Sequence, residues 1–192
     1  MAASSAAAPR ATTARPLPRL LYASFEARVA AAAIDALVLF IIAALLIIAG
    51  ALNILISSDF ERVNASGTSI NLFWAMVGAT PPAFLLYFFA GMAVWGQTAG
   101  AAVMRVMIVR SDGRPLGVFG ALARVIAMLL YVLLIGLGAV GAYALRDDPA
   151  LAALALGLSL VVSVAGILWA AVDSHRRTLH DRLAGTIVVQ AG

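Results

Sequence analysis

The stretch VAAAAIDALVLFIIAALLIIAGALNILI, residues 29–56, decides the fold class of this chain. It is longer than the roughly 20 apolar residues that an α-helix needs to cross ~30 Å of hydrocarbon. Asp35 is the only charged residue within it. The stretch therefore predicts a membrane-spanning helix that carries one acidic side chain.

Three further apolar segments follow, at about 71–95, 122–145 and 150–172. Over the 192 residues of the chain, 64% are hydrophobic and 11% are charged, which is not the composition of a soluble domain. Glycine and serine along the third and fourth segments favour close helix packing. We expect an all-α integral membrane protein with four transmembrane helices, formed by residues 22–189 and followed by a short tail at 190–192.

The residue counts exclude several kinds of site. The chain has no cysteine, so disulfides, thiolate metal sites and thiol nucleophiles are excluded. With only His175 and His180, a histidine-rich metal centre is excluded too, and we expect no metal or other cofactor. The net charge of +4 is modest and gives no support to nucleic-acid binding. Because no set of serine, histidine and acid lies at one depth in the spans, we expect a protein that is not an enzyme.

Arginines at the ends of the predicted spans indicate the orientation of the chain. Residues 1–21 contain three of them and no acid, and their Ala, Ser, Thr and Pro content predicts a disordered basic tail. Eleven of the 13 arginines lie in the two terminal regions or the central polar segment, and the other two loops hold only Arg62 and Arg146. This predicts cytoplasmic termini and an arginine-rich face for anionic lipid headgroups. The Ala- and Arg-rich, lysine-free composition favours a bacterial inner membrane.

The polar segments carry local signals of their own. Residues 105–109 and 185–189 are short β-strand candidates, and Ser111-Asp112-Gly113 is a turn signal. We expect the two strands to pair at the membrane surface; the alternative is two lipid-facing amphipathic segments. The short link at 146–149 predicts a tight helical hairpin, and Pro81-Pro82 predicts a kink or a local unwinding of the second span.

Arg28 and Asp35 are the first candidates for a functional or structural polar site. An acid inside a membrane span needs a partner. Seven residues are nearly two helical turns, so the two side chains share a face but lie about 10 Å apart along the axis. We therefore expect Asp35 to find a cation from another segment, or water in a cavity, or to be neutral because burial raises its pKa.

A second cluster, DSHRRTLHDR at residues 173–182, follows the fourth span. Its alternating opposite charges favour a folded, self-paired elbow at the headgroup boundary. A catalytic interpretation of His180 and Asp181 lacks a nucleophile, and a metal interpretation fails because the adjacent arginines repel a cation.

Several of these residues together carry a resemblance to a known family. Tyr22 to Phe25, Arg28 and Asp35 are followed by the motif Gly96-Gln97-Thr98-Ala99-Gly100, then by Asp112-Gly113 and by RTLHDRLAGT at residues 177–186. This order resembles the RDD family of membrane proteins, named for one arginine and two aspartates. The resemblance places the arginine at Arg28 and the first aspartate at Asp35. It places the second at Asp181, with Asp173 as the other claimant.

One position departs from the family pattern. The family usually has a basic residue directly after the second glycine of its Gly-Gln-Thr motif, and here Ala101 and Ala102 stand there. The resemblance implies either transport, including cation/proton exchange, or an accessory role.

From the residues we favour an accessory or scaffold subunit of a larger membrane complex. In this interpretation Arg28, Asp35 and Asp181 form a buried ionic lock, and the partners are lipid and other membrane subunits or further copies of the chain. The alternative is a small transporter in which Asp35 exchanges a proton for a cation.

Overall fold

The computed structural model describes residues 21–60 and 63–191. The basic tail expected at residues 1–21 lies outside the described residues, apart from Leu21. Four long helices dominate the structure: α1 (Phe25–Ser57), α2 (Gly67–Trp95), α4 (Gly117–Ala144) and α5 (Pro149–Leu168). Each is long and apolar enough to cross a membrane, so the four predicted spans are confirmed, with ends that differ by a few residues.

The two predicted strands also exist and pair with each other. Strand β1 (Val106–Arg110) runs antiparallel to β2 (Thr186–Gln190), with Val106 opposite Gln190 and Arg110 opposite Thr186. The segment just before α1 extends this pairing, because Ala23 N donates to Val188 O at 3.0 Å. The strands therefore satisfy each other's backbone groups, and the interpretation of both segments as lipid-facing amphipathic pieces is wrong.

Three short helical elements add to those expected from the sequence. They are α3 (Ala99–Val103), the 3₁₀ turn η1 (Trp169–Ala171) and α6 (Leu179–Leu183). Both α3 and α6 begin at a threonine, Thr98 and Thr178, whose hydroxyl accepts a hydrogen bond from the backbone amide three residues later. Threonine caps of this kind start a helix even where the apolar pattern is too short to indicate one.

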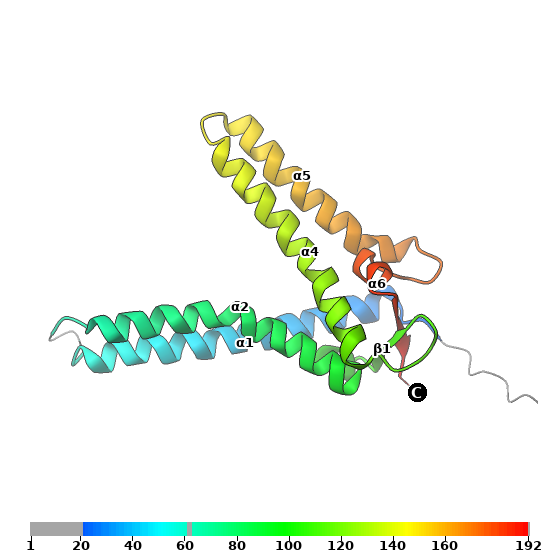
Figure 1. Ribbon diagram of the computed structural model, residues 1–192, viewed down its shortest axis with the longest axis horizontal. Helices are drawn as coiled ribbons and strands as arrows, with labels where there is room; N and C mark the ends of the chain where they lie inside the picture. Colours follow the sequence, from blue (N-terminus) through cyan, green and yellow to red (C-terminus); the bar gives the residue numbers. More distant parts are fainter. Residues whose placement is uncertain (1–20, 61–62, 192) are drawn as a thin grey trace, which may run out of the picture.

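The long helices form two hairpins that meet at one end of the molecule (Figure 1). Helix α1 packs on α2, and α4 packs on α5, while α2 touches α4 near the junction. The sheet, α6 and both ends of the described chain lie at this junction, and the hairpins diverge with distance from it (Figure 1). We call this junction the sheet end.

The buried core is concentrated at the sheet end. It contains Ala23 and Ala31 near the start of the chain, Met92 at the end of α2, Ile108 in β1 and Val188 in β2. Along the spans, by contrast, few side chains are buried, as expected where lipid replaces water.

Small residues set the close approach of α4 and α5. A Cβ atom added to Gly138 would lie 2.0 Å from the Ser159 hydroxyl, and one added to Gly141 would lie 3.5 Å from the Ala155 Cβ. The link between the helices is tight, and the Asp148 carboxylate caps α5 by accepting from the amides of Ala150 and Leu151. This hairpin follows the prediction from its short polar link.

The Pro81-Pro82 pair does not unwind the second span. Helix α2 runs without a break from Gly67 to Trp95, with both prolines inside it. Their rings lie on an exposed part of the helix, and the Thr80 hydroxyl donates to Met76 O at 3.4 Å. Of the two alternatives, the local unwinding is therefore wrong and the kink stays a prediction; the helix tolerates the missing amide donors at two exposed positions.

Candidate functional site

One buried carboxylate joins three separate elements at the sheet end. Asp181 in α6 is 0% exposed, and its Oδ2 accepts a hydrogen bond from Arg28 Nη1 of α1 at 2.8 Å. Its Oδ1 forms an ion pair with Arg124 of α4. We call Arg28, Arg124 and Asp181 the ion cluster.

The short helix α6 holds Asp181 in place through a capping box. Thr178 Oγ1 accepts from Asp181 N at 3.2 Å, and Asp181 Oδ2 accepts from Thr178 N at 3.0 Å. The same carboxylate oxygen thus caps α6 and binds Arg28. Since reciprocal caps of this type fix the first turn of a helix, the carboxylate reaches the two guanidinium groups in a defined direction.

Strand β2 is tied to the ion cluster as well. Arg124 donates to the hydroxyl of Thr186, which in turn donates to Asp181 O at 3.4 Å. Arg28 Nη2 donates to Val188 O at 3.4 Å. The cluster therefore connects α1, α4, α6 and β2 through hydrogen bonds to charged groups, which are stronger than neutral ones.

The positive and negative charges within the ion cluster do not cancel. Burial by itself raises the pKa of Asp181, but the positive charges around it, that of Arg124 first, outweigh burial and hold this pKa well below its usual range. Asp181 is therefore ionised at neutral pH. Two guanidinium groups and one carboxylate leave the cluster with a net charge of +1.

His180 lies beside the ion cluster as a neutral imidazole. Its ring packs edge-on against Tyr131, with centroids 5.6 Å apart, and Nε2 lies 3.5 Å from Arg124 Nη2. Burial and the charge of Arg124 lower the pKa of His180 to about 4. Near pH 7 the unprotonated ring nitrogen can accept a hydrogen bond from Arg124.

Asp35 has a separate set of partners. Its Oδ1 accepts from the Tyr87 hydroxyl at 2.5 Å and from Gly100 N at 2.8 Å. Its Oδ2 accepts from the Thr98 hydroxyl at 2.6 Å. Hydroxyl and amide donors thus hold Asp35, and among the described residues no arginine forms an ion pair with it. The expected ionic lock of Arg28, Asp35 and Asp181 is therefore wrong for Asp35, which is not part of the lock.

The Gly-Gln-Thr motif places the donors to Asp35. Gly96 ends α2 in a left-handed conformation with φ 69°, and Thr98 both caps α3 and donates to Asp35. A Cβ added to Gly100 would lie 2.0 Å from Ala31 O and 2.9 Å from the Asp35 carboxyl carbon. Only glycine lets α3 come close enough to α1 for its amide to reach the carboxylate. Gln97 N donates to Gly91 O within the turn.

Asp173 lies outside the ion cluster. Its Oδ2 accepts from the backbone amides of His175 and Arg177 and from Arg177 Nε at 3.2 Å. The hydrogen bond from the Arg177 backbone is the main reason that the pKa of Asp173 lies below its usual value. Asp173 therefore orders the turn before α6, and Asp181 is the aspartate that Arg28 contacts.

Arg124 is the residue of this site that sequence reasoning missed. It belongs to the arginines of the central polar segment that indicate orientation, and it also lies inside the apolar segment at 122–145. An arginine within a span needs a partner, and that rule would have identified it. Its side chain is only 7% exposed.

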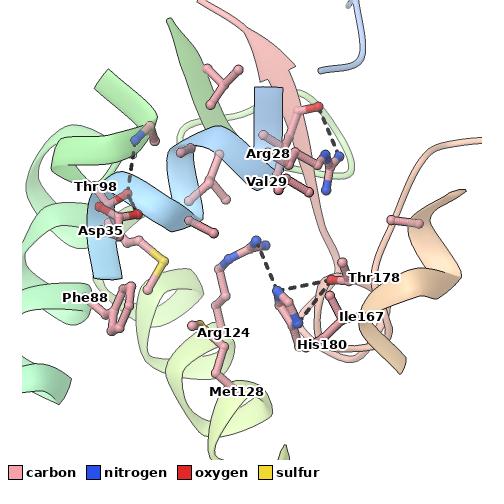
Figure 2. Close-up of a pocket in the computed structure, with 18 of the residues that line it drawn as sticks. Arg28, Val29, Asp35, Phe88, Thr98, Arg124, Met128, Ile167, Thr178 and His180 are labelled. Atoms are coloured by element: carbon pink, nitrogen blue, oxygen red, sulfur yellow. Dashed lines mark hydrogen bonds between the residues drawn. The ribbon is translucent and has the colours of Figure 1, made fainter. Parts of the chain in front are cut away.

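A pocket lies between these polar groups (Figure 2). Its volume is about 320 Å³, and both hairpins and the sheet end line it. Figure 2 shows Arg124 and His180 facing each other, with Asp35 and Thr98 grouped on the side of α1 and α3. Arg28 and Asp35 of the first span and His180 of the C-terminal cluster thus line the same pocket.

Replacement of Asp181 by asparagine should destabilise the folded protein strongly. Asp181→Asn leaves Arg28 and Arg124 buried without a counter-charge, at a cost of about 3–5 kcal/mol. The control is Asp112→Asn, because Asp112 pairs with Arg110 and Arg114 at 3.6 and 3.9 Å on the exposed turn, where such pairs contribute about 0–1 kcal/mol. Thermal unfolding in detergent micelles measures both, and equal losses would contradict the central role of Asp181.

The neutral state of His180 predicts a specific pH dependence of stability. The pKa of this histidine is 6.5 when unperturbed and about 4 in the fold, so the unfolded chain binds more protons between these values. Stability should fall as the pH drops from 6.5 to 4, by about 3 kcal/mol at most. His180→Gln should lose this part of the pH dependence, and His175→Gln, at an exposed position, should keep it. If the free energy of unfolding changes with pH in the same way in both variants, the assignment is refuted.

The comparison with protein families gives one match, which covers the residues of the site. The model of the RDD family matches residues 22–185, a range that includes Arg28, Asp35, Arg124 and Asp181. Comparisons with curated proteins and with solved structures find no match. With four helices suited to crossing a membrane and a match over most of its length, the chain belongs to the RDD family and is an integral membrane protein.

Proposed function

We propose that the chain is a non-catalytic membrane protein that serves as an accessory or scaffold subunit of a larger membrane complex. The observation that carries this proposal is the ion cluster, in which Asp181 binds both Arg28 and Arg124 and so joins three elements. Charged side chains that are paired in this way hold helices together. They make the sheet end a fixed platform from which the two hairpins extend (Figure 1).

The outer faces of the hairpins support this proposal. Large apolar side chains such as Phe40 in α1, Leu86 in α2, Val132 in α4 and Val161 in α5 are more than half exposed. Away from the junction, each hairpin packs mainly within itself. Long apolar faces of this kind suit contact with other membrane subunits or with further copies of the chain, as well as with lipid.

We place the sheet end on the cytoplasmic side of a bacterial inner membrane. The support is the arginine distribution, together with the way the fold gathers it. Arg28, Arg124, the arginines of the β1 region and those of residues 176–182 belong to elements at the sheet end (Figure 1). Their positive charge suits the anionic headgroups of the inner leaflet.

Reporter fusions test this orientation. Green fluorescent protein at the C-terminus should fluoresce, and alkaline phosphatase at the same position should be inactive, because the first works in the cytoplasm and the second only outside it. Alkaline phosphatase inserted after Asp147, between α4 and α5, should be active. The opposite pattern at the two positions would reverse the proposed orientation.

One observation favours transport as the second candidate function. Asp35, an acid within a span, lines the pocket between the hairpins. A cation that binds there must compete with three donors already on its carboxylate, from Tyr87, Thr98 and Gly100. Because these donors already occupy both carboxylate oxygens, we rank transport below the accessory role.

Purification from native membranes separates the two functions. Tagged full-length protein, extracted in two mild detergents, should retain another membrane protein at the same molar ratio in both, as measured by quantitative mass spectrometry. The protein alone, reconstituted in vesicles, should show no cation-dependent proton flux. Recovery of the chain alone or only with its own copies contradicts the accessory role, and flux that Asp35→Asn abolishes but Asp112→Asn preserves establishes transport instead.

A further inference from the structure

Large apolar side chains are exposed at the sheet end as well as along the spans. Val103 belongs to α3, Phe119 to the first turn of α4, and Leu183 is the last residue of α6, while Val172 directly follows η1. Their side chains are between 60% and 87% exposed. The contacts within one chain therefore leave an apolar side chain open on each of four elements, and we call these four residues the apolar set.

The apolar set continues the lipid-facing surface of the spans. Trp95 ends α2 and Trp169 directly follows α5, and both are exposed. Helix α3 begins shortly after Trp95, and Val172 lies shortly after Trp169. Tryptophans at span ends are typical of the level at which acyl chains meet headgroups. The neighbouring apolar side chains therefore begin at this level and not beyond it.

Helix α6 lies beside the spans and not only beyond their ends. The ring of His180 packs edge-on against Tyr131 of α4, with centroids 5.6 Å apart. A Cβ atom added to Gly166 of α5 would lie 3.4 Å from Leu179 Cδ2. Tyr131 and Gly166 both belong to helices that are suited to crossing a membrane. Because these two helices hold α6 against their sides, its exposed Leu183 reaches the depth of the acyl chains.

Exposed arginines lie next to the apolar set in the chain. Arg105 closely follows Val103, Arg182 directly precedes Leu183, and both arginines are exposed. Segments that lie in a membrane interface combine apolar side chains, which enter the acyl boundary, with arginines, which reach the headgroup phosphates. A lipid leaflet offers acyl chains and phosphates in adjacent layers, so it fits both kinds of side chain. The other exposed arginines of the sheet end are Arg110, Arg114 and Arg176.

We propose that the sheet end is inserted into the adjacent lipid leaflet, with the apolar set among the upper parts of the acyl chains and the neighbouring arginines at the phosphates. The partner of this surface is bilayer lipid and not a protein subunit. The proposal deepens the lipid contact that we proposed for the arginines. It rests on the sheet end lying at a membrane surface, and it depends neither on the accessory role nor on the side of the membrane.

Single cysteine variants test this insertion, because the chain has no cysteine of its own. Val103→Cys, Phe119→Cys, Val172→Cys and Leu183→Cys each carry one bimane fluorophore. The control is Ser111→Cys, at an exposed position in the turn after β1, which lies on the side of the sheet end away from the hairpins (Figure 1). The full-length protein is purified and placed in nanodiscs of phosphatidylethanolamine and phosphatidylglycerol.

Two quenchers report the surroundings of each fluorophore. One is a phospholipid with a nitroxide near the top of its acyl chain, and the other is iodide in the water. At the positions of the apolar set, we expect the lipid quencher to act about threefold more strongly than iodide, and at Ser111→Cys we expect the reverse. Each variant replaces an exposed side chain, so the thermal unfolding midpoint should stay that of the unaltered protein. Four positions on four elements keep the test decisive if one variant does not fold.

Two results would overturn the proposal. If iodide quenches the apolar set as strongly as it quenches Ser111→Cys, the sheet end lies in water and its apolar surface is left for a protein partner. If neither quencher reaches the apolar set in the purified protein, further copies of the chain cover it. The accessory role is tested separately, since a failure to recover a partner subunit from native membranes would leave the quenching pattern unchanged.

Discussion

The structure depends on one constraint, that the carboxylate of Asp181 must stay paired with two arginines from different membrane helices. Arg28 and Asp181 are 153 positions apart in the chain, and Arg124 comes from a third element. In surroundings where ions are poorly solvated, none of the three groups can lose its partners cheaply. Any arrangement of the hairpins must therefore keep α1, α4 and α6 together at one end, while the other ends remain free to diverge.

Asp35 forms a second connection at the same end by different chemistry. It binds α2 through Tyr87 and α3 through Thr98 and Gly100. The Gly-Gln-Thr motif is thus a structural device, in which a left-handed glycine ends one helix, a threonine starts the next and a second glycine permits close approach. The ion cluster thus holds the first hairpin to the second, and Asp35 holds α1 to α2 and α3.

The pocket is a consequence of these two connections. The ion cluster binds α1 to α4, and Asp35 binds α1 to α2 and α3, and a pocket of about 320 Å³ lies between these two connections. What remains is a pocket with charged side chains at one end and apolar walls. A platform fixed at the sheet end leaves the outer helix faces free to contact lipid or other membrane subunits.

The amino-acid sequence by itself determined the four spans, the paired strands, the tight hairpin between α4 and α5, and the choice of Arg28, Asp35 and Asp181 as residues to follow. These features depend on hydropathy, turn residues and motifs that lie within short windows of the chain. Only the tertiary structure decided that Arg124 completes the ion cluster, that hydroxyl and amide donors hold Asp35, and that α2 continues through Pro81-Pro82. Each of these depends on which distant segments meet in space, or on which helix face stays uncovered, and local sequence patterns carry no information about either.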